Sequence, residues 1–558
     1  MNEAAPSATP RPWGRIVLGG SALVLIPLML ALAVMAAKFR GLGINQAMEQ
    51  AQIARHVAAG DGLVTDSLRP VSLAIQPALK GHPDLYHPPL PPLLLGLVFA
   101  LTHPSDRAAA ALGLLLWVAT IVLTFLVARR WFGTTVASLA AAFAACNVAM
   151  LKSALLGMPY PLVAILLLLQ AWLAAPAPRR ADEPAPPTED LRGDWRIAGA
   201  AVLGALAAMS HYLFFFLAPA VGVHLVASRR RRGRAALIFG LAFVATTLPW
   251  MIRNFHWGRS PFFSLYWFEA MAGTDAWPGD TIWRSMAAAS TGPWEFAAAH
   301  PFQMMRKISN GLIRFWSESP AVTDPVVAFL FVSALFSRRD RGPWRGWLAA
   351  AAVGLLLTAA ASCVFRAEPE MLLCWTPLMA IPAAAQVVAW MAERVEQVSL
   401  RRYWSIRLIP SIFQDPKALR LLLYRGAVLG VLALVGFPLW YYVWVYRAEP
   451  AAATLDESAF AESVPAEAVV MTDQPALVAW KGRRRAVWLC LEEREWDLLE
   501  ARGGRIDVTY ITPTVNALLP ASRAAWWLWI ASPRGVYRDL SPADAGRLPG
   551  VLRLRGRG

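Results

Sequence analysis

The chain has 558 residues, of which 57% are hydrophobic and only 16% are charged, and its mean hydropathy is +0.43. This composition excludes an ordinary soluble domain and predicts an all-α polytopic membrane protein. A formal net charge of +16 can indicate nucleic-acid binding. Here, however, the arginines stand in short clusters between apolar segments, as they do in the cytoplasmic loops of membrane proteins. No nucleic-acid partner is therefore expected, and membrane lipid headgroups are the expected contacts of the arginine run 229–234.

The first apolar run, 16–37, follows Arg11 and Arg15. Its length of about 22 residues suffices to cross a bilayer, and no small-residue cleavage site follows it clearly. We therefore expect an uncleaved first helix whose N-terminus lies in the cytoplasm.

Further apolar segments lie at 90–102, 108–128, 134–151, 160–175, 197–212, 213–228, 235–252, 322–337, 346–364, 371–391 and 425–446. The segment 90–102 is short and begins among prolines, so it is predicted to lie at the interface or to re-enter. The remaining segments give about 11 transmembrane helices. With this count the arginine clusters between the helices all face the cytoplasm.

The same topology places a first outer loop at 38–107 and a long tryptophan-rich loop at 253–321 on the outer side, together with everything after Arg447. We predict a transmembrane domain over 1–446 and an outer domain over 447–558. In the latter, strands are expected at 468–471, 485–489 and 506–511, and helices at 473–480 and 492–501. This alternation predicts a small C-terminal α/β soluble domain. It contains no glycine-rich phosphate loop, so no cofactor is assigned.

The first outer loop begins with a helical pattern. Asn45, Glu49, Gln52 and His56 fall on one stripe, and alanines fall on another. Asn45 is the expected N-cap residue and Gly60 the expected C-terminal stop. We expect one face of this helix to lie on the membrane surface and the polar face to line a wet cavity.

Two motifs resemble those of a known family. The first loop reads NQAMEQAQIAR and then HPDLYHPPLPPLLLG, and PWMIRN closes an apolar helix at 249–254. They are similar to motifs of the GT-C type membrane glycosyltransferases, specifically the family of dolichyl-phosphate-mannose protein mannosyltransferases and bacterial aminoarabinose transferases. Arg366 followed by an apolar helix with Pro377, and the stretch 464–489, add weaker matches.

The resemblance implies many membrane helices, juxtamembrane helices and a catalytic cavity on the outer side of a bacterial inner membrane, with the C-terminal domain in the periplasm. It also implies an activity. The family moves a sugar from a polyprenyl-phosphate carrier, with inversion, to a hydroxyl acceptor on a protein, lipid or glycan.

Such a transfer needs a carboxylate for the acceptor proton and cationic groups for the departing phosphate. The family usually places Asp, often followed by Glu, where this chain has Asn45 and Gln46. Glu49 lies one turn further along and is the expected catalytic base. A solvated charge on the helix face is its other interpretation. The alternative function is a catalytically silent relative that binds carrier lipid or scaffolds envelope assembly, and a transporter is the third possibility.

Four basic residues are candidates for binding the carrier phosphate. Each also has a structural explanation: a local ion pair, a helix-end anchor, or a side chain that extends to the interface. Arg366 stands out because it lies alone in an outer loop, against the positive-inside trend. The candidates are Arg253, Arg366, Lys152 and Arg55.

Other polar residues are assigned to the substrate-facing loop: Asn45, Gln46, His56, His82, Asp84, His87 and Asn254. His82, Asp84 and His87 could supply three ligands to a divalent cation. The prolines beside them favour a turn that holds the juxtamembrane segment, so no metal is predicted. The tryptophans and phenylalanines from Trp257 to Trp283 could cover the sugar or carrier, but an interfacial aromatic belt is the favoured interpretation.

Overall fold

The computed structural model describes residues 13–174, 191–229, 231–337, 344–397, 416–446, 455–502, 504–513, 540–542 and 548–555. The first half of the chain forms α1 (Trp13–Lys38), α2 (Asn45–Ala59), α3 (Pro70–Ile75), α4 (Leu90–Leu101), α5 (Asp106–Phe132), α6 (Thr134–Cys146), α7 (Val148–Leu155), α8 (Tyr160–Ala174), α9 (Leu191–Ala208), α10 (Leu217–Ala227) and α11 (Arg232–Gly258).

The second half forms α12 (Pro293–Ala299), α13 (Pro301–Val322), α14 (Pro325–Phe336), α15 (Trp344–Val364), α16 (Thr376–Gln397), α17 (Pro416–Trp444), α18 (Glu457–Ser463), α19 (Pro475–Trp480) and α20 (Glu493–Ala501). Short 3-10 helices lie at Tyr212–Phe216, Leu265–Ala270, Thr281–Arg284, Ala287–Ser290 and Pro369–Cys374.

Five of the described helices are long and apolar enough to cross a membrane, namely α1, α5, α11, α15 and α17. The number rises to seven if two bent pairs, α6 with α7 and α13 with α14, each count as one span. The helices α4 and α8, and the run from Tyr212 through α10, are apolar but shorter. Each apolar segment expected from the sequence thus contains helix, and the chain is mostly helical.

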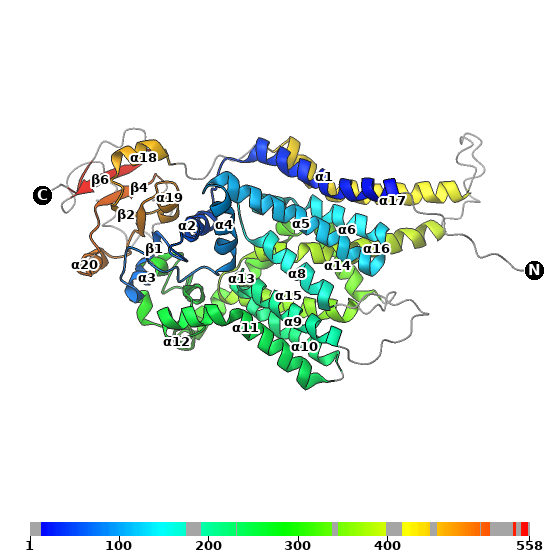
Figure 1. Cartoon of the computed structure of the whole chain (residues 1–558), viewed down its shortest axis with the longest axis horizontal. Coiled ribbons are helices and arrows are strands. Elements are labelled where there is room, and N and C mark those ends of the chain that lie inside the picture. The colour runs from blue at the N-terminus through cyan, green and yellow to red at the C-terminus, as the bar shows by residue number, and fades with distance from the viewer. Residues whose placement is uncertain are drawn as a thin grey trace, which may run out of the picture.

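The long helices and the sheet occupy opposite ends of the molecule (Figure 1). The long helices pack side by side, with α1 and α17 together along one edge of the bundle. The ammonium of Lys38 at the end of α1 donates to the backbone carbonyl of Tyr446 just beyond α17. This contact joins the start of the first outer loop to the last helix before the sheet.

The sheet has six described strands in the order β1-β3-β2-β4-β6-β5. They are β1 (Ser67–Leu68), β2 (Val469–Thr472), β3 (Arg485–Trp488), β4 (Val508–Ile511), β5 (Leu540–Pro542) and β6 (Val551–Arg555). The first four in this order are parallel. Strand β6 pairs antiparallel with β4, and β5 pairs antiparallel with β6. The structure confirms the elements expected from the sequence in this region, which are strands β2, β3 and β4 and helices α19 and α20.

Strand β1 was not expected, because it comes from the first outer loop. It pairs in parallel with β3, with Ser67 opposite Ala486 and Leu68 opposite Val487. A second link to the loop follows on α2, where the Arg55 guanidinium donates to the carbonyls of Ala479 and Trp480 at 3.0 and 3.2 Å. The sheet therefore includes chain from both sides of the predicted boundary at 447, which itself lies outside the described residues.

The expected position of α2 on the membrane surface is wrong. Its residues from Ala47 to Ala54 are buried, because its apolar side packs against α4 and α19. The N-cap residue is Ile44 rather than Asn45, which is the first helical residue, whereas Gly60 ends the helix at φ 89° as expected. Burying the polar stripe brings Glu49 and Gln52 into the protein interior.

The long loop predicted at 253–321 is more structured than the sequence suggested. It contains α12 and the 22-residue α13, and α13 meets α14 at a bend of 107°. Before α12, the segment from Leu265 to Ser290 folds back as three 3-10 helices. Its aromatic residues form a buried cluster with Tyr86 and Tyr212.

The close approach of α5 and α7 gives a test of this packing. A Cβ atom at Gly113 on α5 would lie 2.1 Å from the backbone oxygen of Ala154, whereas one at Gly430 on α17 would meet nothing within 4 Å. Overpacking of this kind costs about 1–3 kcal/mol. We expect Gly113→Ala to lower the thermal unfolding temperature of the purified protein and Gly430→Ala to leave it unchanged or slightly raised. Equal unfolding temperatures for the two variants would contradict this packing.

Candidate functional site

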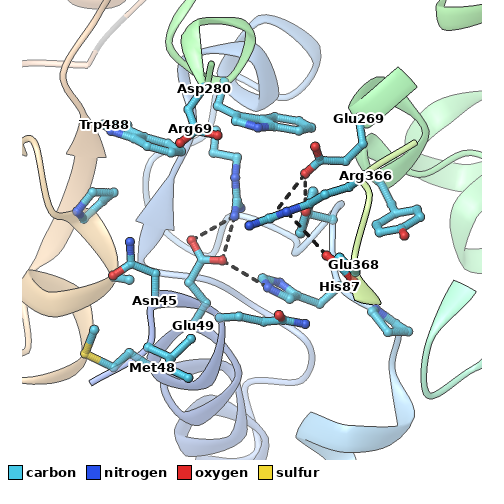
Figure 2. A pocket seen from close by; sticks show the side chains of 18 of the residues that line it. Asn45, Met48, Glu49, Arg69, His87, Glu269, Asp280, Arg366, Glu368 and Trp488 are labelled. Atoms are coloured by element: carbon cyan, nitrogen blue, oxygen red, sulfur yellow. Dashed lines mark hydrogen bonds and ion pairs between the residues drawn. The ribbon is translucent and has the colours of Figure 1, made fainter. Parts of the chain in front are cut away.

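A cavity of about 580 Å³ lies where the first loop, the long loop, the 3-10 segments and the sheet meet. Its walls carry many charged and aromatic side chains (Figure 2). The lining residues are Gly43, Ile44, Asn45, Gln46, Met48, Glu49, Arg69, Tyr86, His87, Pro88, His211, Tyr212, Tyr266, Glu269, Asp280, Trp283, Arg366, Glu368, Gln474, Pro475, Ala476 and Trp488.

Glu49 on α2 lies at the centre of one wall and has three polar partners. Arg69 donates from Nη2 to both carboxylate oxygens, at 2.8 and 2.6 Å. The Ser67 hydroxyl of β1 donates to Oε1 at 3.0 Å, and Nε2 of His87 lies 3.0 Å from Oε2. Arg69 directly follows β1, so the strand pairing that holds β1 in the sheet also positions the cation beside Glu49.

His87 lies between two carboxylates. Its Nδ1 is 3.1 Å from Oδ1 of Asp84, and its Nε2 faces Glu49. Burial opposes the charge on the imidazole, but Asp84 and Glu49 outweigh it and raise the pKa of His87 to about 9. Burial likewise opposes the charge on Glu49, but Arg69 and His87 lower its pKa to about 2. Glu49 is therefore ionised at physiological pH and His87 is mainly the imidazolium.

The opposite wall holds a second charged group. The Tyr86 hydroxyl donates to Oε1 of Glu269 at 2.6 Å, and Nη1 of Arg366 lies 3.7 Å from the same oxygen. Arg366 also lies 3.4 Å from Glu368, which contacts His211 at 3.1 Å. The Arg366 side chain is 54% exposed, whereas that of Arg69 is 9% exposed. Arg366 is thus the more accessible of these two arginines.

The two carboxyl groups of this wall, Glu269 and Glu368, have pKa values shifted in opposite directions. Burial raises the pKa of Glu269 above its ordinary value, against the opposing effects of Arg366 and the Tyr86 hydrogen bond. For Glu368, burial is outweighed by His211 and Arg366, which lower its pKa. The cavity therefore contains carboxyl groups of different basicity within one enclosed space, a feature typical of functional sites.

Five of the residues singled out from the sequence line the cavity: Asn45, Gln46, Glu49, His87 and Arg366. Asp84 lies behind them and accepts from the backbone N–H of His87 at 3.0 Å. The prolines around His87 thus belong to a turn that Asp84 holds, as the sequence favoured. His82 is also buried, and its Nδ1 lies 2.9 Å from the Ala78 carbonyl.

The other candidates lie outside the cavity. Arg253 donates to the carbonyls of Leu63 and Asp84 at 3.3 and 2.8 Å, and so ties α11 to the first loop. Asn254 is buried beside it on α11. Lys152 lies over the rings of Tyr442 and Tyr446, at 4.9 and 4.6 Å from their centres.

Arg55 and His56 form a separate group at the end of α2. Arg55 lies 3.3 Å from Asp66 and also donates to the backbone carbonyls of Ala479 and Trp480 on α19, while Nε2 of His56 is 2.7 Å from the same Asp66 oxygen. Within the described ranges, no group of three or more His, Cys, Asp or Glu side chains is arranged to hold a metal ion. Arg55 and His56 both contact Asp66, and Arg55 also fixes α2 to α19.

Several cavity residues were missed in the sequence: Arg69, Tyr86, His211, Tyr212, Tyr266, Glu269, Asp280 and Glu368. Glu269 had a signal, because it is an acid inside an aromatic run of an outer loop. Trp283 is buried, with its ring centre 5.8 Å from the Arg69 guanidinium, so it belongs to the cavity wall rather than to an interfacial belt. Arg69 had no local signal, since its role depends on the pairing of β1 with β3.

The chain is similar to membrane glycosyltransferases of the GT-C type. Residues 86–252 match the family model described as dolichyl-phosphate-mannose-protein mannosyltransferase, which confirms the resemblance inferred from the loop motifs. None of the curated protein sequences matches the chain.

Solved structures match over nearly the whole chain. ArnT from Cupriavidus metallidurans bound to undecaprenyl phosphate is 13% identical with a TM-score of 0.56, over 98% of this chain and 99% of that one. The apo form of ArnT gives 14% and 0.54, over 98% of each chain. The archaeal oligosaccharyltransferase AglB from Archaeoglobus fulgidus, with an inhibitory peptide and a dolichol-phosphate, gives 12% and 0.54, over 90% of this chain and 70% of that one. The chain is thus similar to multi-pass membrane proteins.

The raised pKa of His87 predicts a pH dependence of stability. A group whose pKa rises on folding stabilises the fold fully below its unfolded value, near 6.5, and loses that contribution as pH rises through about 9. We expect the unfolding temperature of the wild type to fall over this window and the fall to be smaller in His87→Gln. His103→Gln, at an exposed position, is the control. An unchanged pH slope in His87→Gln would rule out this charge state.

Proposed function

We propose that the chain is an integral-membrane glycosyltransferase that moves a sugar from a polyprenyl-phosphate carrier to a hydroxyl acceptor, with inversion. The observation that carries this proposal is that side chains of opposite charge line the same cavity. An ionised, buried carboxylate, Glu49, faces an accessible guanidinium, Arg366. The similarity to the GT-C fold and to the mannosyltransferase family supports the same reaction class.

In the proposed reaction the carrier phosphate binds Arg366, which stabilises the negative charge as the phosphate leaves. The acceptor hydroxyl donates a hydrogen bond to Glu49 and attacks the anomeric carbon from the face opposite the phosphate, which inverts that centre. A carboxylate with a pKa near 2 is a weak base in the free enzyme. The hydroxyl becomes strongly acidic only as the new bond forms, so Glu49 acts on the transition state.

We further propose that the N-terminus lies in the cytoplasm of a bacterial cell and that the cavity and the sheet face the periplasm. We also propose, from the pattern of the sequence, a transmembrane domain over 1–446 and a C-terminal domain over 447–558. Three of the basic candidates, Arg253, Lys152 and Arg55, lie outside the cavity. We assign them a structural role, in which they hold α11, α7 and α2 in place.

The alternative is a catalytically silent relative that binds carrier lipid or scaffolds envelope assembly. One observation favours it: Arg69, His87 and Ser67 already engage both oxygens of Glu49. A substrate hydroxyl would have to share or replace one of these contacts.

Sugar transfer from a panel of labelled polyprenyl-phosphate sugars to an envelope extract separates the two functions. Loss of a general base costs about 10²–10⁴-fold in rate, so we expect Glu49→Gln to reduce transfer by that order while undecaprenyl phosphate still binds. Full activity in Glu49→Gln would exclude Glu49 as the base. No transfer by the wild type with any donor would favour the silent relative.

Arg366→Ala tests the phosphate contact. A hydrogen bond to a charged group contributes about 1.5–3 kcal/mol, so we expect the dissociation constant for undecaprenyl phosphate to rise about 10- to 150-fold. Arg306→Ala removes an equally cationic side chain whose ion pair with Asp275 is exposed, and it should bind as the wild type does. Equal affinities of the two variants would place the phosphate elsewhere.

A further inference from the structure

One wall of the cavity is built by the edge of the parallel sheet. Strands β1, β3 and β2 run in the same direction, so their carboxyl ends lie at one edge. Arg69 directly follows β1, Trp488 is the last residue of β3, and Gln474 lies two residues after β2. All three line the cavity. Ligands of open α/β sheets bind outside the carboxyl ends of the strands, so this edge has the usual position of a binding surface.

The side chains at this edge differ from those of the opposite wall. Trp488 is half-buried and packs partly against the aromatic cluster of the long loop. Gln474 is the N-cap residue of α19, but its side chain makes no capping hydrogen bond. Figure 2 shows Trp488 on the sheet side of the cavity, with Arg366 and Glu368 on the other side. The sheet edge therefore offers an indole ring and a neutral amide, where the opposite wall offers charges.

An aromatic ring in the same wall as an amide that makes no capping hydrogen bond suits a sugar ring. The C–H face of a pyranose packs on an indole, and an amide both donates to and accepts from hydroxyl groups. A phosphate would need cations here, but Arg69, the arginine that lines the cavity from this edge among the described residues, is already paired with Glu49. A purely apolar chain would leave the amide without a partner, at a cost.

We propose that the carboxyl edge of the sheet is a carbohydrate-binding wall, in which Trp488 stacks on a sugar ring and Gln474 binds its hydroxyls. The inference rests on the proposed glycosyl transfer and deepens it, because it makes the acceptor a glycan or glycolipid. Two sources could supply such a ring, the acceptor and the carrier-linked sugar. The acceptor is the assigned source, since Arg366, the proposed phosphate contact, lies on the opposite wall.

Binding of simple sugars tests the wall without requiring turnover. Saturation-transfer NMR on the full-length protein in nanodiscs would use methyl glycosides of glucose, galactose, mannose and N-acetylglucosamine. We expect at least one to bind the wild type, Trp488→Ala to weaken it by about tenfold, and Trp488→Phe to retain most of the binding. Gln474→Ala should weaken it by about threefold. Trp440→Ala, at an exposed position on α17, is the matched control.

Absence of glycoside binding to the wild type, or unchanged binding in Trp488→Ala, would overturn the proposal. A threonine-containing peptide that binds in place of the glycosides would overturn the carbohydrate assignment. A second arm adds the labelled polyprenyl-phosphate sugars. A glycoside that stays bound occupies the acceptor place, whereas displacement would reassign the wall to the donor sugar. A wild type that binds glycosides but transfers no sugar would reject the proposed reaction and leave the wall intact.

Discussion

The buried ion pair between Glu49 and Arg69 is the interaction on which the cavity depends. Two ions taken out of water need close contact and further hydrogen bonds to offset the loss of hydration. Ser67 and His87 supply those contacts to Glu49, and Asp84 in turn supports His87. Removing Glu49 would leave Arg69 buried without the carboxylate that it contacts, and removing either carboxylate would leave His87 with one of its two. The network therefore fixes α2, the end of β1 and the turn before α4 relative to one another.

The sequence was informative wherever the signal was local. Apolar segments predicted the helices, and alternating strands and helices predicted three of the six described strands, β2, β3 and β4. The polar stripe on α2 led to Glu49, and a lone outer arginine led to Arg366. In each case the residues that form the pattern lie within a few turns of one another. Local patterns were therefore sufficient to predict that Glu49 and Arg366 belong to the site.

The remaining features depend on contacts between distant parts of the chain. Strand β1 has two residues, too few for any periodic signal, and it forms only because β3 offers an edge. Arg69 acquires its partner through that pairing. Arg253 and Lys152 are charged residues at helix ends, and the sequence could not show whether they turn toward a cavity or toward backbone carbonyls and aromatic rings. Burial of α2 was missed because α19, which covers it, lies far along the chain.

The shared sheet also constrains the order in which the protein can mature. Arg55 and Trp480 are 425 positions apart. The contact between them can form only after most of the helices have been synthesised. Only when β3 has been made can β1 find its neighbour and Arg69 settle beside Glu49. Contacts of such long range form late in folding. A chain that ends before β3 therefore lacks the strand with which β1 pairs, and its cavity is incomplete.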